Sequence, residues 1–159
     1  MNPKLRPALT EDRDFLFRLY ASTRLHEIAA FGWPAAQQEA FLRMQFNAQQ
    51  QWYETLYSKA EHQIIEKDNE RIGRMIVLRA DDAMHLVDIS LLPEYRGQGI
   101  GGELMRSLIN ECARLGVCLR LQVLQTNPAL RLYERLGFLR SGVDQMYVHM
   151  ELRPEAPDR

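Results

Sequence analysis

The sequence predicts a mixed α+β fold in a single domain. Its 159 residues are the length of one ordinary domain. The composition, with 46% hydrophobic and 26% charged residues, is close to the average for globular proteins. Two helical patterns are followed by three strand patterns in a row, after which helices and strands alternate. These observations predict helices packed against a mixed sheet over residues 1–152, followed by a flexible Pro-rich tail over residues 153–159.

The first 60 residues are predicted to form one strand and two helices. "KLRPAL" (4–9) is a short strand, and Thr10 is the expected cap of a helix with acidic residues in its first turn. The second helix is predicted to open at Trp33 and Pro34. Both helices carry apolar residues at helical spacing, which we interpret as core. These residues are Phe15, Leu16, Leu19 and Tyr20 in the first helix, and Phe41, Met44, Ala48, Trp52 and Leu56 in the second.

The rest of the chain is predicted to contain six strands and two helices. An antiparallel meander of "HQIIEK", "RIGRMIVLR" and "MHLVDISLL" turns at Asp68-Asn69 and at Asp81-Asp82. A helix from about residue 100 closes at Gly116 and is followed by the strand "VCLRLQVL". Asn127 and Pro128 are the expected N-cap and first residue of a short helix that stops at Gly137. The strands "FLRSG" and "QMYVHMEL" complete the order β, α, α, β, β, β, α, β, α, β, β.

Charge, hydropathy and cysteine content exclude several classes of protein. The net charge of −1, with both signs interspersed, argues against a nucleic-acid partner. No apolar stretch approaches the length of a bilayer span, so no membrane partner is expected. The polar N-terminus lacks the apolar centre of a secretory signal, so a cytoplasmic location is expected. Cys112 and Cys118 have neither disulfide-scaffold nor metal-ligand spacing, so no metal is expected and both are interpreted as packed hydrophobic residues.

The segment "EYRGQGIGGEL" (94–104) fits two glycine patterns. Gly97, Gly99 and Gly102 match the dinucleotide pattern GxGxxG, which requires an acidic residue at the end of the next strand. That strand ends in "VLQTN", and too little chain follows for a doubly wound sheet. A Walker A loop is also excluded, because Glu103 and Leu104 stand where its lysine and hydroxyl are needed.

The second pattern predicts an anion site at the start of a helix. A strand runs into "PEYRGQGIGG", so unpaired N–H groups and the positive end of the helix dipole converge at Gly99 to Gly101. Glycines allow a ligand to approach the backbone, and Arg96 can add a charge-assisted contact. The alternative interpretation is a tight turn without a ligand, but three glycines after an arginine exceed what a turn requires.

Two segments together resemble the GNAT superfamily of N-acetyltransferases. "VDISLLPEYRGQGIGGELMRSLINEC" resembles the acetyl-CoA motif of that family, and "LQVLQTNPALRLYERLGFLRSG" resembles its second conserved segment. The resemblance covers residues 87–142. It implies the GNAT fold, with a central, mostly antiparallel mixed sheet of six to seven strands flanked by about four helices. It also implies acetyl-CoA as a cosubstrate.

The resemblance assigns coenzyme contacts by motif position. The backbone of Ile89 and Leu91 would meet the pantetheine arm, while their side chains are free to pack in the core. Asn127 matches a position beside the coenzyme, although helix capping would equally explain it. The expected pyrophosphate loop comprises Arg96, Gly97, Gln98, Gly99, Gly101 and Gly102.

The resemblance also implies catalytic residues. Tyr133 matches the tyrosine that protonates the departing thiolate, and a packed helix tyrosine is the alternative. Asp88 is the candidate base for the incoming ammonium, although Val87 stands where some relatives carry a glutamate. His85 and Glu94 are the fallback candidates. Backbone N–H groups near Leu91 would stabilise the oxyanion.

The implied function is direct transfer of an acetyl group from acetyl-CoA to a primary amine in a ternary complex, without an acyl-enzyme. The acceptor is a small amine or a peptide amine, and residues 20–57 and 140–147 would shape its site. Glu27, Phe31 and Trp33 are candidates for the wall of this site or for packing between the helices. A non-catalytic acetyl-CoA-binding or sensory module is the alternative. Open sheet edges allow a homodimer, but no sequence feature specifies one.

Overall fold

The computed structural model describes residues 2–154, which form seven strands and four α-helices in the predicted order. Residues 155–159, most of the expected tail, lie outside the described residues. The helices are α1 (Arg13–Ala29), α2 (Ala35–Leu56), α3 (Ile100–Leu115) and α4 (Ala129–Arg135). The strands are β1 (Lys4–Pro7), β2 (Glu61–Lys67), β3 (Glu70–Arg79), β4 (Ala83–Leu91), β5 (Cys118–Leu124), β6 (Leu139–Asp144) and β7 (Tyr147–Leu152). None of the described helices is long and apolar enough to cross a membrane.

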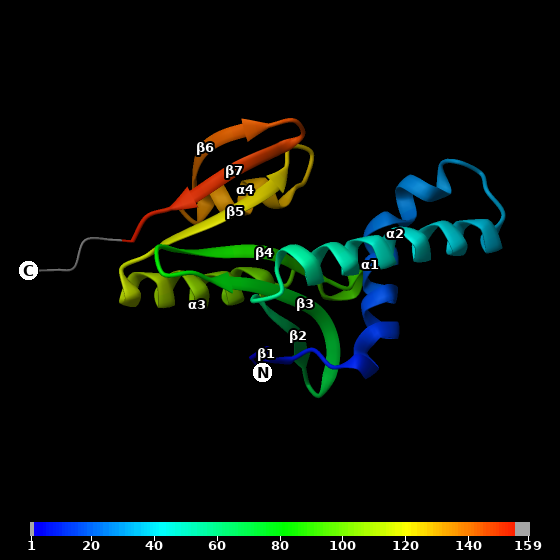
Figure 1. Ribbon diagram of the computed structural model, residues 1–159, viewed down its shortest axis with the longest axis horizontal. Coiled ribbons are helices and arrows are strands. Elements are labelled where there is room, and N and C mark those ends of the chain that lie inside the picture. Colours follow the sequence, from blue (N-terminus) through cyan, green and yellow to red (C-terminus); the bar gives the residue numbers. More distant parts are fainter. Residues whose placement is uncertain (1, 155–159) are drawn as a thin grey trace, which may run out of the picture.

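The strands form one sheet in the order β1-β2-β3-β4-β5-β7-β6 (Figure 1). Among residues 2–154 only β4 and β5 pair in parallel, and α3 makes the crossover between them. The turn at Asp68 and Asn69 has positive φ at both residues, as a tight hairpin requires. The predicted mixed, mostly antiparallel sheet with four helices is therefore confirmed.

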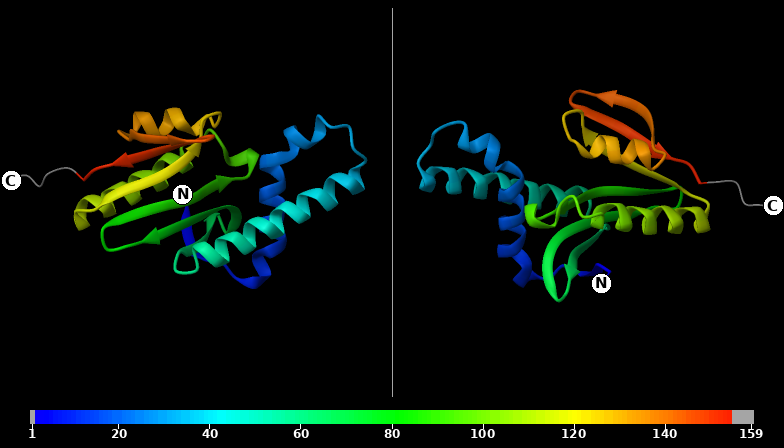
Figure 2. Two further views of the ribbon diagram at one scale, coloured as in Figure 1. Left: turned by 45° about the horizontal axis from the view of Figure 1, so that its top comes forward. Right: turned by 180° about the vertical axis from the view of Figure 1, so that it is seen from behind.

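Two apolar cores lie on the two faces of the sheet. One contains the buried side chains of α3 together with Tyr133 from α4, packed on β3, β4, β5 and β7. The other joins α1 and α2 to Ile64 of β2. Figure 2 shows α3 and α4 together on one face, and the α1–α2 hairpin extending beyond the ends of the strands. The α1–α2 connection therefore lies at the far end of the molecule from β5, β6 and β7.

The start of α1 differs from the prediction that Thr10 caps it. Thr10–Asp12 form a 3₁₀ turn, and α1 begins at Arg13 without a side-chain cap. Asp12 has turned inward instead: it is 1% exposed and accepts hydrogen bonds from the Arg6 guanidinium at 2.8 and 2.9 Å. It also accepts from the Leu9 backbone N–H and from Arg71. An ion-pair network thus ties the first strand to α1, in place of the predicted cap.

The expected core stripe of α2 is wrong at four of its five positions: Phe41 packs against the core, whereas Ala48 and three larger residues are exposed. Met44, Trp52 and Leu56 are 60%, 51% and 58% exposed, and the buried residues of this helix are Leu42, Phe46 and Tyr53. Met44 lies in the first half of α2, which projects beyond the sheet, so its side chain meets solvent (Figure 1). The α1 prediction is confirmed, because Phe15, Leu16, Leu19 and Tyr20 are all buried.

Candidate active site

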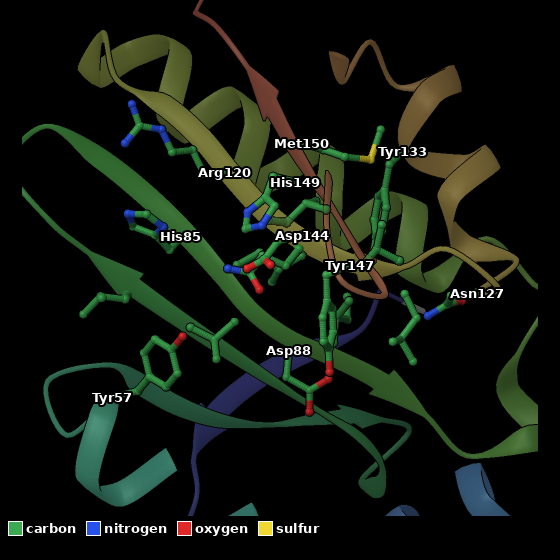
Figure 3. Close-up of a pocket in the computed structure, with 18 of the residues that line it drawn as sticks. Tyr57, His85, Asp88, Arg120, Asn127, Tyr133, Asp144, Tyr147, His149 and Met150 are labelled. Carbon is green, nitrogen blue, oxygen red and sulfur yellow. The ribbon is translucent and has the colours of Figure 1, made fainter. Parts of the chain in front are cut away.

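A cavity of about 820 Å³ opens where β4 and β5 separate (Figure 3). The two strands pair from Ala83–Cys118 to Leu86–Leu121 and no further, although both continue for three or more residues. The backbone edge of β4 beyond Leu86 is therefore not paired with β5. Side chains from the end of α2, from β4, β5 and α4, and from the β6–β7 hairpin line the cavity.

A β-bulge at Val87 determines which way Asp88 points. Leu86 pairs with Val77 and Asp88 pairs with Ile76, so Val87 is an extra residue in β4. Before the bulge, Met84 and Leu86 face the core under α3; after it, Ile89 and Leu91 do. Strict alternation would have placed Asp88 on that apolar face. The bulge turns it to the opposite face, where it lines the cavity.

The Asp88 carboxyl is largely enclosed. Its side chain is 26% exposed, and its Oδ2 atom lies 3.8 Å from Nε of Arg74. Burial raises the pKa of Asp88, while the positive charge of Arg74 and a backbone hydrogen bond from Ile89 act in the opposite direction. A carboxyl with a raised pKa is better matched to taking a proton near neutral pH than an exposed one.

Tyr133 lines the same cavity from α4. It is 7% exposed, and the centroid of its ring lies 5.8 Å from that of Phe138, so the packing that the alternative interpretation expects is also present. Burial, followed by the negative charge of Asp88, raises the pKa of Tyr133 to about 12. The hydroxyl therefore keeps its proton at neutral pH and can act as a donor.

The glycine-rich loop connects β4 to α3. Gly97 and Gly99 have φ of 73° and 82°, and Gly99 is the N-cap of α3. A Cβ at Gly97, Gly99 or Gly101 would meet no atom within 4 Å, so the loop leaves open space over its backbone. Glycine at these positions suits a ligand that approaches the N–H groups of the first turn of α3.

Arg96, Gln98 and Gly102 lie in or beside this loop but make internal contacts. Arg96 Nε donates to the Leu91 carbonyl at 2.9 Å, and Gln98 Nε2 donates to the Glu94 carbonyl at 2.8 Å. A Cβ at Gly102 would meet the guanidinium of Arg106. The two side-chain bonds brace the loop, and both are exposed, so an anion could compete for the same donors.

Ile89 and Leu91 occupy the part of β4 that extends beyond its pairing with β5. Their side chains pack against the core under α3, while β3 holds the other edge of the strand. At that edge Gly73 is required, because a Cβ would collide with the Ser90 carbonyl oxygen. The predicted separation of backbone and side-chain roles is therefore possible at Ile89 and Leu91.

The start of α4 is one residue later than predicted: Pro128 is the N-cap, and Asn127 precedes it while its side chain still caps a backbone N–H of the helix. Asn127 Oδ1 accepts a hydrogen bond of 2.9 Å from the Ala129 N–H, and α4 begins at Ala129. Asn127 also lines the cavity. Capping explains its residue type without a ligand, and its position keeps a coenzyme contact available.

The fallback bases differ in position. His85 lines the cavity, and burial, with Arg120 nearby, lowers its pKa. Glu94 is exposed in the 3₁₀ turn Pro93–Tyr95 and is not among the residues that line the cavity. Of the two, only His85 faces the same space as Asp88 and Tyr133.

The structure does not bring Glu27, Phe31 and Trp33 to the cavity. They lie at the α1–α2 connection, where Phe31 and Trp33 stack on each other with ring centroids 5.1 Å apart. Other aromatic side chains line the cavity instead: Trp52, Tyr53 and Tyr57 near the end of α2, and Tyr147 on β7. Of these four, only Trp52 belongs to the apolar stripe that the sequence predicts for the second helix, where the pattern indicates core. No sequence pattern singled out Tyr53, Tyr57 or Tyr147. Of the region predicted to shape the acceptor site, the cavity is lined from residues 49–57 and 141–147 and not from residues 20–48. That an acceptor binds there stays a prediction.

The two cysteines lie away from the cavity. Cys112 is buried beside the sulfur of Met84, and burial raises the pKa of its thiol to about 11. Cys118 is half-buried at the start of β5. Neither cysteine lines the cavity. Within residues 2–154, no cluster of three or more His, Cys, Asp or Glu side chains could hold a metal ion.

Comparisons with known proteins agree with this geometry. The model of the acetyltransferase (GNAT) family matches residues 22–138. A Haemophilus influenzae ribosomal protein bS18-alanine N-acetyltransferase is 35% identical over 82 residues, which cover 51% of this chain and 56% of that protein. A Bacillus subtilis protein provisionally named for the same activity is 33% identical over 90 residues, covering 55% and 60%. The chain therefore matches less than two thirds of the length of either relative.

The fold resembles that of a solved structure over nearly its whole length. The PaiA N-acetyltransferase of Thermoplasma acidophilum, crystallised in complex with coenzyme A, superposes with a TM-score of 0.69. The match covers 96% of this chain and 99% of that one, at 20% sequence identity. At this identity the likeness is one of fold.

Proposed function

This chain belongs to the acetyltransferase (GNAT) family, and from that premise we propose that it transfers the acetyl group of acetyl-CoA to a primary amine. The cavity at the divergence of β4 and β5 carries the proposal. Asp88 and Tyr133 line this one space from different elements, as a proton acceptor and a proton donor. An amine that attacks a thioester needs both: it must lose a proton, and the departing sulfur must gain one.

Residues of the β4–α3 segment would hold acetyl-CoA, which supplies the activated thioester. We assign the pantetheine arm to the backbone of Ile89 and Leu91, because β4 is not paired with β5 beyond Leu86. Asn127 would contact the coenzyme from the opposite wall. The open space over the glycines supports a pyrophosphate site formed by Arg96, Gly97, Gln98, Gly99, Gly101 and Gly102.

The roles of the side chains follow from their protonation. Asp88 would accept a proton from the acceptor ammonium, leaving a neutral amine able to attack. Tyr133, neutral because of its raised pKa, would donate its hydroxyl proton to the leaving sulfur. Backbone N–H groups near Leu91 would stabilise the developing oxyanion. No covalent bond between enzyme and acetyl group forms in this scheme.

The acceptor is a small amine or a peptide amine, and we propose that a peptide N-terminus should be tested first. Both curated relatives are named for acetylating an alanine of a ribosomal protein. Aromatic side chains beside Asp88 suit a cationic group in the acceptor, because tyrosine and tryptophan rings attract ammonium groups.

Release of free thiol from acetyl-CoA tests the proposal. The protein would be assayed with a peptide that begins with alanine, with free amino acids and with small amines. Turnover with at least one acceptor, and at least tenfold less in Asp88→Asn or Tyr133→Phe, is expected. Binding of acetyl-CoA without turnover on any acceptor would favour a non-catalytic module on the same fold.

We also propose a cytoplasmic location and the homodimer that open sheet edges allow. Fractionation of cells that produce the protein would check the location. Size-exclusion chromatography with light scattering would distinguish a mass near 18.6 kDa from twice that value.

A further inference from the structure

Arg74 occupies an unusual place in the middle of β3. It is 5% exposed, and within residues 2–154 it and Asp12 are the charged residues that lie buried. Its neighbours along the strand, Gly73 and Met75, are apolar and buried. Removing a guanidinium from water costs several kcal/mol unless other groups compensate its charge. The contacts of Arg74 therefore indicate what it is for.

The register of the sheet places Arg74 beside Asp88. Arg74 pairs with Ser90 across β3 and β4, and Asp88 pairs with Ile76, so Arg74 and Asp88 are diagonal neighbours. Diagonal residues on one face of an antiparallel pair are within reach of each other when one side chain is long. The bulge at Val87 is what brings Asp88 onto this face.

The end of α2 holds the guanidinium in position. Nη1 of Arg74 donates a hydrogen bond of 3.0 Å to Oε1 of Gln50. The guanidinium carbon lies 5.2 Å from the centroid of the Tyr53 ring, within cation–π range. Two residues of α2 thus hold the Arg74 guanidinium, and Asp88 approaches it from the neighbouring strand β4.

The Arg74–Asp88 contact differs from the other buried ion pair in this protein. Arg6 and Asp12 share two direct hydrogen bonds of 2.8 and 2.9 Å, which occupy both carboxylate oxygens. Arg74 Nε and Asp88 Oδ2 are 3.8 Å apart, which is close enough for an ion pair but too long for a hydrogen bond. Arg74 therefore supplies charge to Asp88 without occupying the lone pairs that a proton would use.

We propose that Arg74 is a positioning residue: held by Gln50 and Tyr53, it keeps Asp88 ionised and directed into the cavity, ready to take the proton of the acceptor ammonium. This inference rests on the proposed N-acetyltransferase function. In the proton-transfer step the N–H bond of the ammonium breaks and an O–H bond forms on Asp88, while Arg74 neither gains nor loses a proton.

The groups that face Asp88 from the neighbouring elements are consistent with this role. They are Arg74 from β3, Tyr53 from α2, Tyr133 from α4 and Tyr147 from β7. Figure 3 shows Tyr147 pointing toward the Asp88 carboxyl. Burial raises the pKa of Tyr53 and that of Tyr133, so both are neutral at neutral pH. Arg74 is then the cation in this group of four that opposes the effect of burial on the pKa of Asp88.

The direct test is a titration of the Asp88 carboxyl by NMR on protein labelled with ¹³C at Cγ of aspartate. The Asp88 signal is assigned as the one lost in Asp88→Asn. In Arg74→Met, which removes the charge and keeps an apolar chain of similar reach, the titration midpoint of Asp88 should move to higher pH. Arg74→Lys, which keeps a positive charge, should restore much of the wild-type midpoint. Arg71→Met, which removes a charge from the same strand away from Asp88, should leave it unchanged.

Kinetics give a second readout with one amine acceptor used throughout. In Arg74→Met, kcat/KM on the acid limb of the pH profile should fall about tenfold, the scale expected for losing an opposite charge within 6 Å, and should recover as pH rises. Only ionised Asp88 accepts a proton, so a higher midpoint shifts the limb to higher pH. A loss of activity equal at every pH would indicate a merely structural role.

An unchanged Asp88 titration in folded Arg74→Met would overturn the inference. Circular dichroism checks folding, and if this variant does not fold, Gln50→Ala replaces it, with a smaller shift in the same direction expected and an unchanged midpoint overturning the inference. The NMR readout needs no turnover. If the wild type acetylates no acceptor, the proposed function fails, and the titration still decides whether Arg74 controls Asp88.

Discussion

Polar side chains that are removed from water occupy two kinds of place in this protein: the wall of the cavity and the start of α1. Tyr133 and Asp88 line the cavity, whereas Asp12 sits at the base of α1 among cationic partners. All three are partly or wholly removed from water, but their environments have opposite effects. Burial raises the pKa of Asp88 and that of Tyr133, while the hydrogen bonds of Arg6 hold the pKa of Asp12 well below its usual range.

Tyr133→Phe should lower kcat about 100-fold and leave acetyl-CoA affinity unchanged, because it removes only the proton donor. The ring would keep its packing on Phe138, so the fold should be retained. Steady-state kinetics and calorimetric titration with acetyl-CoA check the two quantities. Tyr20→Phe, which removes a hydroxyl in α1 bonded to Gln45, is the matched control and should turn over normally. Unimpaired turnover in Tyr133→Phe would remove this residue from the mechanism.

Asp12→Asn should lower the free energy of unfolding at pH 7 by about 2 kcal/mol, because a neutral amide replaces the buried carboxylate that accepts charged hydrogen bonds from Arg6. The pKa of Asp12 is lower in the folded than in the unfolded state, so its contribution is present above the unfolded pKa and is lost as pH falls toward the folded one. The difference between variant and wild type should therefore shrink below about pH 4.

Urea unfolding at a series of pH values measures this difference. Asp14→Asn, an exposed change two residues away, should have a small effect at every pH. A difference between Asp12→Asn and wild type that stayed constant down to pH 2 would contradict the ion-pair account.

The strands, helix and loop around the site depart from regular geometry at the positions that shape the cavity. The bulge at Val87 reverses the facing of β4, and the end of its pairing with β5 at Leu86 opens the cavity. The loop that follows turns through two glycines with positive φ before α3 begins. Each irregularity interrupts a regular ladder or helix at the position where the proposed coenzyme would approach the backbone.

Gly101→Ala separates the role of the loop in folding from its role in binding. Gly101 is in the first turn of α3, where a Cβ meets no atom, and alanine is the better helix former by about 0.5–1 kcal/mol. The thermal midpoint should hold or rise. Affinity for acetyl-CoA should fall about tenfold or more, because a methyl group would separate a phosphate from the backbone N–H donors.

Calorimetric titration and thermal unfolding measure both effects. Gly142→Ala in β6, which also adds a methyl into open space, should leave acetyl-CoA affinity unchanged. If Gly101→Ala bound acetyl-CoA as tightly as wild type does, Gly101 would not belong to the coenzyme site.

At the scale of the whole molecule, two apolar cores hold the sheet. The proposed ligand would lie where β4 and β5 diverge, between the two halves of the sheet. Strands β1 to β4 lie on one side of the divergence, and β5, β7 and β6 lie on the other. Only the four residue pairs from Ala83–Cys118 to Leu86–Leu121 join β4 to β5. A ligand seated there would add contacts between the halves that the free protein lacks.

Acetyl-CoA should therefore stabilise the protein, while NAD should not. At a concentration 100 times its Kd, a ligand bound only by the folded state adds about 2.7 kcal/mol. For a domain of this size that corresponds to a rise in Tm of about 5–10 °C. Differential scanning fluorimetry with each nucleotide measures the shift. An equal shift with NAD, or none with acetyl-CoA, would contradict the coenzyme assignment.

The sequence alone determined the order of the elements, the family resemblance and the position of the glycine-rich loop before α3. The periodicity in α3, the glycines around it and the Asn-Pro pair before α4 are local signals, since each depends on residues within a few positions. The same reasoning failed at Thr10 and at the apolar stripe of α2. At Thr10, partners distant in the sequence outweighed local propensity. In α2, Met44 meets solvent and Trp52 lines the cavity, because tertiary packing decides which face of a helix is covered.

Only the tertiary structure decided the surroundings of the site. Arg74 reads in the sequence as one more charge in a strand, and nothing near it predicts Asp88 as a neighbour. Their contact depends on the pairing of β3 with β4, on the extra residue Val87 and on the position of α2 above both. The physical reason is that register and bulges are set by pairing between separate segments, which no local pattern of residues encodes.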